Sequence, residues 1–226
     1  IGAAAMREQP IDFETLRYTP LEIESSPVRC PSAQASRAME EEIAAARAVG
    51  DTLGGEVAVA IHGVAPALGS YRGGGMMARL SKAAFSVNDV VSVSFGSACD
   101  VTRRRGSAAY DSAVLGAHGF AHTTNISGGI EGGLTTGASV IMRVGVAPSA
   151  SLRAPQKSID LETLSDAESS SAAYSPCLVG GVAVAIEAEI AFALASAYQE
   201  RFGGAAMSDI HSSYDAYMRR LRLAAR

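Results

Sequence analysis

The sequence predicts an α+β protein in which antiparallel sheets are covered by helices. Stretches 56–62 and 90–95 alternate small and β-branched residues as strands do, and the apolar run 138–146 has the composition of a buried strand. Stretches with helical spacing lie between and after them, so helices and strands are mixed along the chain. With 226 residues, the chain is long enough for a full core, as one large domain or two small ones.

Four segments are expected to be helical, and glycines mark where two of them end. The first is rich in Ala and Glu and is followed by Gly50, and the apolar third is followed by Gly203 and Gly204. The last has a basic C-terminal end, which suits the helix dipole. The expected helices are 36–49, 76–85, 182–201 and 208–226.

Two segments lack periodicity. Residues 1–34 are expected to be an irregular lead-in, because prolines divide them into short pieces. Residues 162–175, rich in Ser, Ala and acidic groups, are expected to be a mobile surface loop. We expect 1–226 to form a single domain, with 205–226 as its C-terminal helical segment.

The most apolar run, 178–196, is expected to be a core helix and not a membrane span. Glu187 and Glu189 lie within it, and acidic groups at a bilayer centre cost several kcal/mol. The N-terminus has neither the basic segment nor the cleavage pattern of a signal peptide. The chain begins with Ile, which suggests a fragment, a processed chain or the second piece of a larger protein.

Composition and charge limit the classes of partner. A net charge of −4 gives no electrostatic case for nucleic-acid binding. Cys30, Cys99 and Cys177 lie far apart with no C-x-x-C, which disfavours disulfides and zinc. A reducing, cytoplasmic compartment fits this cysteine usage best.

The stretch 123–137 is the most unusual part of the sequence, because five of its fifteen residues are glycine. Glycine lets the backbone adopt positive φ and approach another group closely. The stretch is therefore either a tightly packed turn or a backbone-lined ligand site. It contains neither the G-x-G-x-x-G dinucleotide fingerprint nor the Walker phosphate loop.

Other polar residues each allow two interpretations. His62, in or at the end of the strand 56–62, is expected to be a hydrogen-bonded structural histidine, with catalysis as the alternative. His118 and His122 have the i, i+4 spacing of metal ligands on a helix, but neighbouring glycines disfavour a helix and no third ligand is evident. The arginine run 103–105 is a solvated patch or a contact for an anionic substrate.

Several stretches, in the same order along the chain, resemble motifs of the chorismate synthase family. The resemblance runs from about residue 28 to 204 with almost no gaps. The matching stretches are 50–55, 63–69, 86–88, 106–111, 123–133, 148–152 and 176–187.

The resemblance implies a β-α-β sandwich of antiparallel sheets around long helices, assembled as a tetramer. It also implies an anti 1,4-elimination of phosphate from 5-enolpyruvylshikimate 3-phosphate (EPSP), which gives chorismate in the aromatic amino-acid pathway. The family uses reduced FMN without net redox change, and the flavin lends an electron transiently as phosphate leaves. Such a site needs backbone N–H groups and hydroxyls for the flavin phosphate and cations for the departing phosphate.

The resemblance also assigns flavin-binding positions. By motif they are Asn88, Asp89, Gly132, Ala147, Pro148, Ser149, Ala150, Ser151 and Ala173. The family's catalytic histidine motifs belong to about its first third, which has no counterpart here, and no histidine of this chain falls on a catalytic position.

This chain departs from the family at several charged positions. A lysine is replaced by Ala147, arginines by Ala173 and Gly181, and aspartates by Ser175 and Ala205. Each arginine replaced by alanine removes a charge-assisted contact, of order 1.5–3 kcal/mol.

Three interpretations follow from these departures. The chain is part of a working chorismate synthase whose missing third comes from another chain, or a divergent lyase for another shikimate-derived acid. Alternatively, it is a non-catalytic or regulatory homologue that pairs with a complete paralogue. The expected partners are a shikimate-type substrate and either further copies of this chain or a chain with the missing region, without nucleic acid, membrane or metal.

Overall fold

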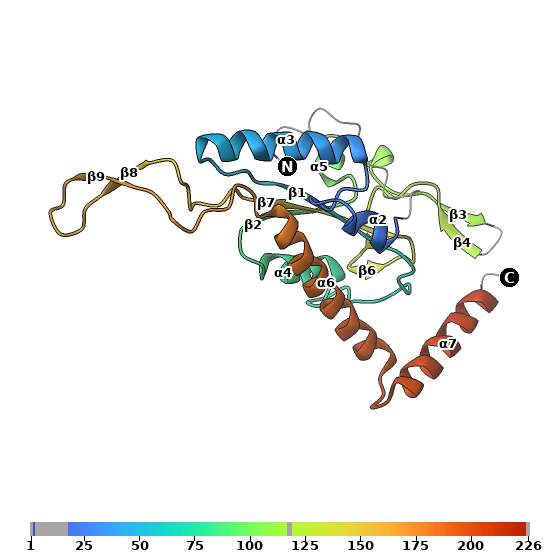
Figure 1. The fold of residues 1–226 in the computed structure, drawn as a ribbon. Coiled ribbons are helices and arrows are strands. Elements are labelled where there is room, and N and C mark those ends of the chain that lie inside the picture. Colours follow the sequence, from blue (N-terminus) through green and yellow to red (C-terminus); the bar gives the residue numbers. More distant parts are fainter. Residues whose placement is uncertain (1, 3–17, 117–118, 225–226) are drawn as a thin grey trace. The chain divides into compact units, whose positions relative to one another are not determined.

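The computed structural model describes residues 2, 18–116 and 119–224 of the chain. The chain divides into two compact units, each assembled from segments that are distant in sequence. Figure 1 shows the helices and strands, coloured in chain order. Unit 1 comprises Ile1–Val57, Val87–Ser92 and Gly145–Ala185, and unit 2 comprises Ala58–Ser86, Val93–Val144 and Ile186–Arg226.

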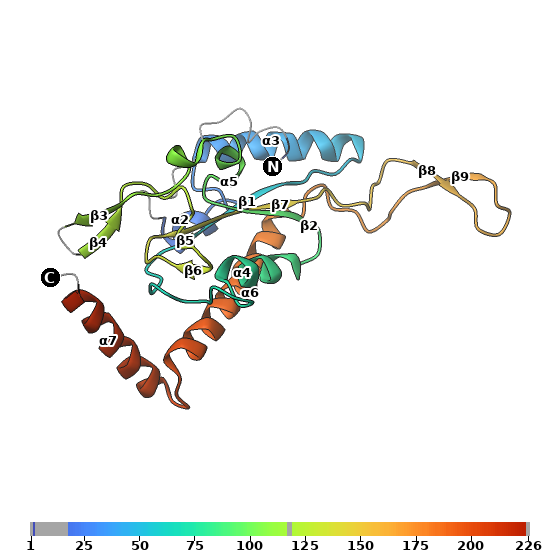
Figure 2. The same cartoon turned by 180° about the vertical axis from the view of Figure 1, so that it is seen from behind.

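Four elements continue from one unit into the other, and three of them are strands of one sheet. This sheet has the order β1-β7-β2, so the strand that comes last in the chain is central (Figure 2). Both faces of β7 are largely buried, as its almost uniformly apolar sequence predicts. The four elements are β1 (Gly55–Ile61), β2 (Val90–Phe95), β7 (Val140–Val146) and α6 (Val179–Phe202).

Unit 1 is built around a long helix, α3. It begins at Ala33 because the hydroxyl of Ser32 accepts a hydrogen bond from the backbone N–H of Ala35, and it ends at Gly50, which is left-handed with φ 75°. The end was predicted and the start lies three residues earlier than expected. The other elements wholly within unit 1 are α2 (Pro20–Glu24), β8 (Gln156–Ile159) and β9 (Asp166–Ser169).

Unit 2 contains the largest fully buried side chains. Leu68, Met76, Leu80, Ile186 and three residues of β7, Val140, Met142 and Val144, are all fully buried in it. Its other elements are α4 (Met76–Phe85), α5 (Ala98–Val101), the 3-10 turn η1 (Gly106–Ala108), β3 (Ala113–Gly116), β4 (Gly119–His122), β5 (Ile130–Glu131), β6 (Leu134–Thr135) and α7 (Met207–Ala224).

Two predictions about unstructured segments need correction. Part of the lead-in 1–34 is the helix α2, because Thr19 and Glu22 form a reciprocal capping box around its first turn; residues 1 and 3–17 lie outside the described part. The stretch 162–175 was expected to be a mobile loop, but Asp166–Ser169 is strand β9 and pairs antiparallel with β8. Its backbone ladder forms without the apolar alternation that reveals most strands.

The stretch 178–196 was expected to be a core helix, but most of the surface of this helix is exposed. The helix α6 forms, from Val179 to Phe202. However, only 17% of its most apolar 18-residue stretch is buried. Ile186 and Ile190 are buried while Val184 and Phe192 are exposed. Among the described residues it is the one helix long and apolar enough, by length and composition, to cross a membrane. A helix that is apolar on all sides is normally enclosed, and this chain encloses one side.

Candidate functional site

The glycine-rich loop 123–137 bends repeatedly through left-handed backbone. All five of its glycines have positive φ, between 55° and 93°. Side chains other than glycine cost about 1–2 kcal/mol per residue in this conformation. The glycines are Gly128, Gly129, Gly132, Gly133 and Gly137.

The first glycine pair lets the loop lie directly against the strand that follows it. A Cβ at Gly129 would lie 2.5 Å from the carbonyl oxygen of Ser139, and one at Gly128 would lie 2.9 Å from that of Ile141. The side-chain amide of Asn125 donates to the Ser139 carbonyl at 2.9 Å, which holds the same approach. At this pair, tight packing is the reason for glycine.

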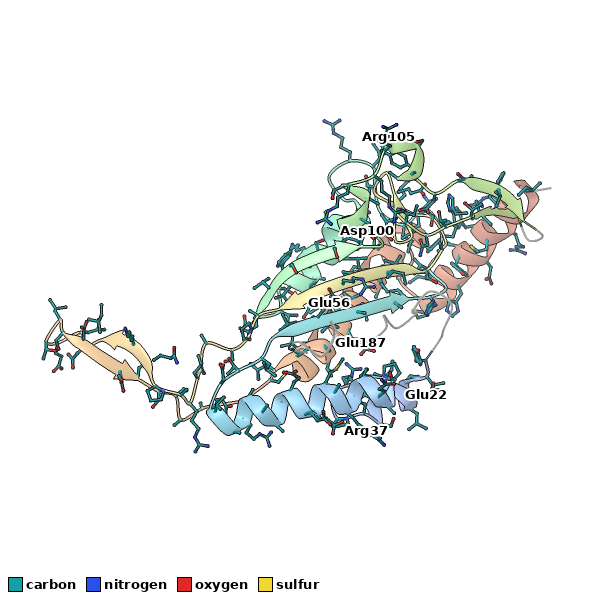
Figure 3. All side chains as sticks on the ribbon, turned by 90° about the horizontal axis from the view of Figure 1, so that it is seen from above. Glu22, Arg37, Glu56, Asp100, Arg105 and Glu187 are labelled. Carbon is teal, nitrogen blue, oxygen red and sulfur yellow. The ribbon has the colours of Figure 1, made fainter. Side chains whose placement is uncertain are left out.

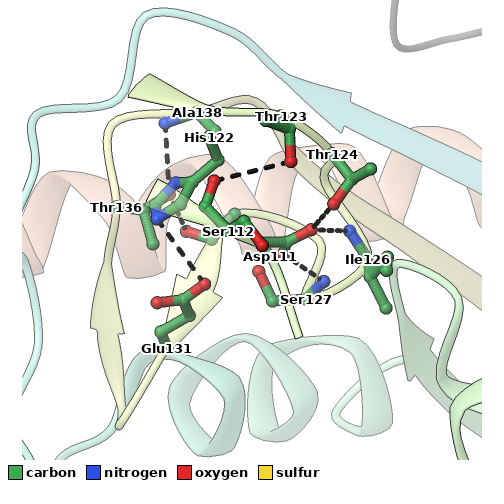
Figure 4. A network of polar contacts seen from close by, with 11 residues as sticks. Asp111, Ser112, His122, Thr123, Thr124, Ile126, Ser127, Glu131, Thr136 and Ala138 are labelled. Carbon is green, nitrogen blue, oxygen red and sulfur yellow. Dashed lines mark hydrogen bonds and ion pairs between the residues drawn. The ribbon is translucent and has the colours of Figure 1, made fainter. Parts of the chain in front are cut away.

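A single carboxylate, that of Asp111, holds the start of the loop (Figure 4). Its Oδ1 accepts hydrogen bonds from the hydroxyl of Thr124 and from the N–H of Ile126 at 2.7 Å, and its Oδ2 accepts from the N–H of Ser127 at 2.9 Å. Partial burial alone would raise the pKa of Asp111, but the hydrogen bonds from Thr124, Ser127 and Ile126 together lower it to about 2. The resemblance placed Asp111 in a motif without indicating these contacts.

The second glycine pair, Gly132 and Gly133, is the turn of the β5–β6 hairpin, in which Glu131 pairs with Leu134. Two consecutive left-handed residues are what a type I′ hairpin turn requires. A Cβ at Gly132 would meet nothing within 4 Å, so this predicted flavin position is open as well as glycine-dependent. His122 faces Glu131, with 3.9 Å between Nε2 and Oε1 (Figure 4).

Eight of the nine predicted flavin positions belong to unit 1, where two of their segments are hydrogen-bonded. The backbone N–H of Ala147 donates to the carbonyl oxygen of Asp89 at 2.8 Å. Asp89 is itself left-handed, with φ 67°, a conformation that aspartate tolerates better than most residues. The turn 88–89 therefore lies directly against the segment 147–151.

The glycine-containing stretch 50–55 also contacts the segment 147–151. The hydroxyl of Thr52 donates to the carbonyl oxygen of Ser149 at 2.7 Å. At Gly54 a Cβ would lie 2.8 Å from the nitrogen of Pro148 and 3.0 Å from the carbonyl carbon of Ala147, so only glycine fits. The resemblance in the stretch 50–55 thus has a packing reason.

The segment 171–173 joins this group through its backbone. The N–H of Ser171 donates to the carbonyl of Leu152 at 2.7 Å, and its hydroxyl donates to the carbonyl of Ala173 at 3.1 Å. Gly132, the ninth position, belongs to unit 2, where it lies in the turn of the β5–β6 hairpin.

The residues at these nine positions do not by themselves fit a flavin mononucleotide. Backbone N–H groups and the hydroxyls of Ser149 and Ser151 can donate to phosphate oxygens. None of the nine residues is a cation and one, Asp89, is a carboxylate, so nothing among them balances a dianionic phosphate. Any compensating charge must come from other residues or another chain.

Unit 1 also contains a cavity of about 600 Å³ next to the start of α6. Two of the positions where the family pattern is broken, Ser175 and Gly181, line it. The charged side chains in its wall are Arg29, Arg47, Glu24 and Glu40. Arg29 and Glu24 form an ion pair at 2.6 Å. The cavity wall thus contains two cations and two carboxylates, which do not by themselves select an anion.

Sequence reasoning missed this cavity, because its wall joins three segments with no motif in common. Arg29 precedes α3, Arg47 lies near the C-terminal end of α3, and Cys177 precedes α6. Only their three-dimensional arrangement brings the arginines beside the serine–proline–cysteine stretch 175–177.

The remaining polar candidates have local roles. Nδ1 of His62, which follows β1, lies 2.8 Å from the hydroxyl of Ser139, so the prediction of a hydrogen-bonded histidine is confirmed. His118 lies outside the described residues. In the part of the chain that the structure describes, no group of three His, Cys, Asp or Glu side chains is placed to hold a metal ion.

Comparison with known proteins agrees with the fold and motifs. The sequence pattern of the family described as chorismate synthase matches residues 4–199. A chorismate synthase from Rubrobacter xylanophilus is 38% identical over 203 residues, which are 89% of this chain and 52% of that protein. One from Desulforudis audaxviator is 36% identical over 225 residues, 98% of this chain and 57% of that protein.

A solved structure shows the same fold. A crystal structure of chorismate synthase superposes with a TM-score of 0.74 at 24% identity, covering 89% of this chain and 54% of that one. This chain belongs to the chorismate synthase family. Both the resemblance and the α+β sandwich predicted from it are confirmed. The chain spans about half the length of the relatives it matches.

Proposed function

We propose that this chain provides one part of a chorismate synthase-type active site in the cytoplasm. The reaction would be the elimination of phosphate from EPSP, in which the carbon–oxygen bond to phosphate and the C6–hydrogen bond break and chorismate forms. Family membership supports this reaction class, a carbon–oxygen lyase acting on a phosphate ester. Reduced FMN is the cofactor that the resemblance implies.

One observation carries the proposal. The hydrogen bond from Ala147 to the Asp89 carbonyl joins two segments that the motifs assign to flavin binding. Thr52 and Gly54 fix the same segment through a hydroxyl and a missing side chain. These contacts within unit 1 support a backbone framework for the proposed site, to which other residues would have to add the charged side chains.

The missing charges define how the chain would act. A departing phosphate needs cations, and this chain has alanine at positions 147 and 173. No histidine stands at a family catalytic position, so proton transfer also needs groups from elsewhere. We therefore propose that the catalytic groups come from a polypeptide with the remaining part of the family's length.

The same alanines favour a second candidate function. A homologue that no longer performs chemistry can lose cations and keep the glycines and core residues that folding needs. In that case the chain is a structural or regulatory subunit of a complete paralogue.

Turnover of EPSP with reduced FMN under anaerobic conditions separates these functions. We expect no turnover by this chain alone and turnover when it is combined with the first half of a chorismate synthase relative. Turnover by a complete paralogue alone, together with a stable complex between that paralogue and this chain, would support the subunit role. Turnover of another shikimate-derived acid by this chain would support a divergent lyase, and turnover of EPSP by the chain alone would contradict the proposal.

A gain-of-charge variant tests the flavin framework separately. Ala173→Arg should strengthen FMN binding about tenfold or more, because a charge-assisted hydrogen bond contributes about 1.5–3 kcal/mol. Ala172→Arg is the matched control, since Ala172 is adjacent and exposed but is not a predicted flavin position. Equal effects of the two substitutions would show that position 173 does not face the flavin.

A further inference from the structure

The arginine run 103–105 has no role in the proposed site. It lies within unit 2, between helix α5 and the turn η1. Arg103 and Arg105 are exposed and form no ion pair with any residue that the structure describes. Arg104 makes a loose surface pair, 3.8 Å from Asp100, of a kind that contributes little to stability. Figure 3 labels Arg105, whose side chain points away from the ribbon. The three guanidinium groups can therefore contact an acidic partner.

A serine follows this run at a spacing that protein kinases recognise. The order is Arg104, Arg105, Gly106, Ser107. Basophilic serine kinases select a serine with arginines three and two positions before it, because carboxylates in the substrate groove of the kinase form charge-assisted hydrogen bonds with both guanidinium groups. No other serine or threonine in the sequence has arginine at both positions.

The structure leaves Ser107 accessible to a kinase. Its side chain is exposed, and its hydroxyl makes no hydrogen bond with the part of the chain that the structure describes. The turn η1 has two backbone hydrogen bonds, donated by the N–H groups of Ala108 at 2.9 Å and Ala109 at 3.1 Å. A kinase binds its substrate in an extended conformation, and opening a turn this short and exposed costs little free energy.

A second serine shows what an inaccessible position looks like. Ser32 also has an arginine three positions before it, Arg29. The hydroxyl of Ser32 caps helix α3 by accepting a hydrogen bond from the N–H of Ala35, and Arg29 is paired with Glu24 at 2.6 Å. A kinase would have to unfold the start of α3 to use this serine.

We propose that Ser107 is a phosphorylation site for a basophilic serine kinase. In the reaction, Oγ of Ser107 attacks the γ-phosphorus of ATP, the bond from that phosphorus to ADP breaks, and the hydroxyl proton passes to the catalytic carboxylate of the kinase. The phosphate adds a charge of about −1.5 to −2, which lowers the charge of the stretch 103–107 from +3 to about +1. Phosphorylation therefore removes most of the attraction between this stretch and an anionic partner.

Phosphorylation of the folded chain in vitro tests the proposal. The probe is the catalytic subunit of cyclic-AMP-dependent protein kinase, a basophilic kinase, with ATP and Mg²⁺, and tandem mass spectrometry locates the phosphate. We expect about one phosphate per chain, at Ser107, and almost none in Ser107→Ala. A chain that takes up no phosphate, or takes it up at Ser32 and not at Ser107, would overturn the proposal.

Arginine variants test how the kinase recognises the site. Arg104→Ala and Arg105→Ala should each slow the initial rate at Ser107 about tenfold or more, because each removes a charge-assisted contact with the kinase. Arg103→Ala is the matched control, since it removes the same charge one position further from the serine, and it should change the rate less than about threefold. Equal slowing by all three substitutions would overturn recognition through the two specific positions.

A synthetic peptide with the sequence of residues 101–111 tests accessibility separately. Because η1 opens easily, the folded chain should be phosphorylated within about tenfold of the rate of this unstructured peptide. A folded chain that reacts more than about a hundredfold more slowly than the peptide would contradict the accessibility of Ser107.

Discussion

Replacing Asp111 with asparagine should loosen the start of the glycine-rich loop. The aspartate carboxylate accepts hydrogen bonds from Thr124, Ile126 and Ser127, whereas an amide has one acceptor oxygen and cannot satisfy all of them. One of the two backbone N–H groups would then face the amide NH2 group instead of an acceptor, and the charge that strengthens each bond would be lost.

The magnitude follows from the pKa of this carboxyl group. Its fall from the ordinary value of 3.8 to about 2 corresponds to roughly 2.5 kcal/mol before any reduction for solvent screening. Because the side chain is half-buried, solvent screening reduces the expected contribution to about 1–2 kcal/mol. The pKa is lower in the folded chain, so this stabilisation is complete above about pH 4 and is lost as the pH falls through about 2.

Hydrogen exchange at the amides of Ile126 and Ser127 measures the effect locally. At pH 7, Asp111→Asn should speed their exchange about five- to thirtyfold. The difference in exchange rate between the variant and the unmodified chain should become smaller as the pH falls from about 4 towards about 2. Asp100→Asn is the control, because Asp100 has a 3.8 Å surface ion pair and no bond to this loop. Unchanged protection in Asp111→Asn, or a gap independent of pH, would refute the reasoning.

Two further predictions concern the stability of unit 2, measured by urea denaturation. Gly129→Ala should cost more than about 3 kcal/mol, since the new Cβ would lie 2.5 Å from the Ser139 carbonyl oxygen, whereas Gly132→Ala should cost about 1–2 kcal/mol because its Cβ meets open space; equal losses would contradict the packing of the first glycine pair. Thr135→Val should cost about 2–4 kcal/mol, because the buried hydroxyl donates to the Ala65 carbonyl at 2.6 Å and accepts from another backbone N–H at 2.8 Å. Thr135→Ser keeps both bonds and should cost about 1 kcal/mol, so a serine variant as unstable as the valine variant would refute the role of the hydroxyl.

The sequence predicted well those helices and strands whose ends are marked by glycines or by a change in apolar periodicity. Helix α4 spans the predicted residues 76–85, since a glycine precedes it and its apolar residues recur at helical spacing. Strand β2 has the predicted bounds 90–95. The expected strand 138–146 begins two residues late, at Val140, because Ser139 is occupied with the loop before it.

Elements that depend on a specific turn or on distant segments were not visible in the sequence. The β8–β9 hairpin depends on the Asp160 side chain closing its turn, and its mostly polar strands carry no alternating apolar pattern. Helix α6 has the composition of an enclosed helix, but how much of it is enclosed depends on what packs against it.

The candidate site likewise has a part that the motifs predicted and a part that they did not. The motifs singled out the segments 88–89 and 147–151, which the structure joins by a hydrogen bond, and the contacts of Thr52 and Gly54 with the second segment give a packing reason for the stretch 50–55. The roles of the nine flavin positions stay a prediction. The cavity with Arg29 and Arg47 could not be foreseen, because its charges come from segments that only folding brings together.

The most direct test of the central claim is a titration of this chain alone with FMN, followed by quenching of flavin fluorescence. The claim is that the chain keeps the backbone framework of a flavin site and lacks the cations that hold the flavin phosphate. We expect a dissociation constant weaker than about 1 µM, tightened in Ala173→Arg and unchanged in Ala172→Arg. Sub-micromolar binding by the unmodified chain would contradict the claim.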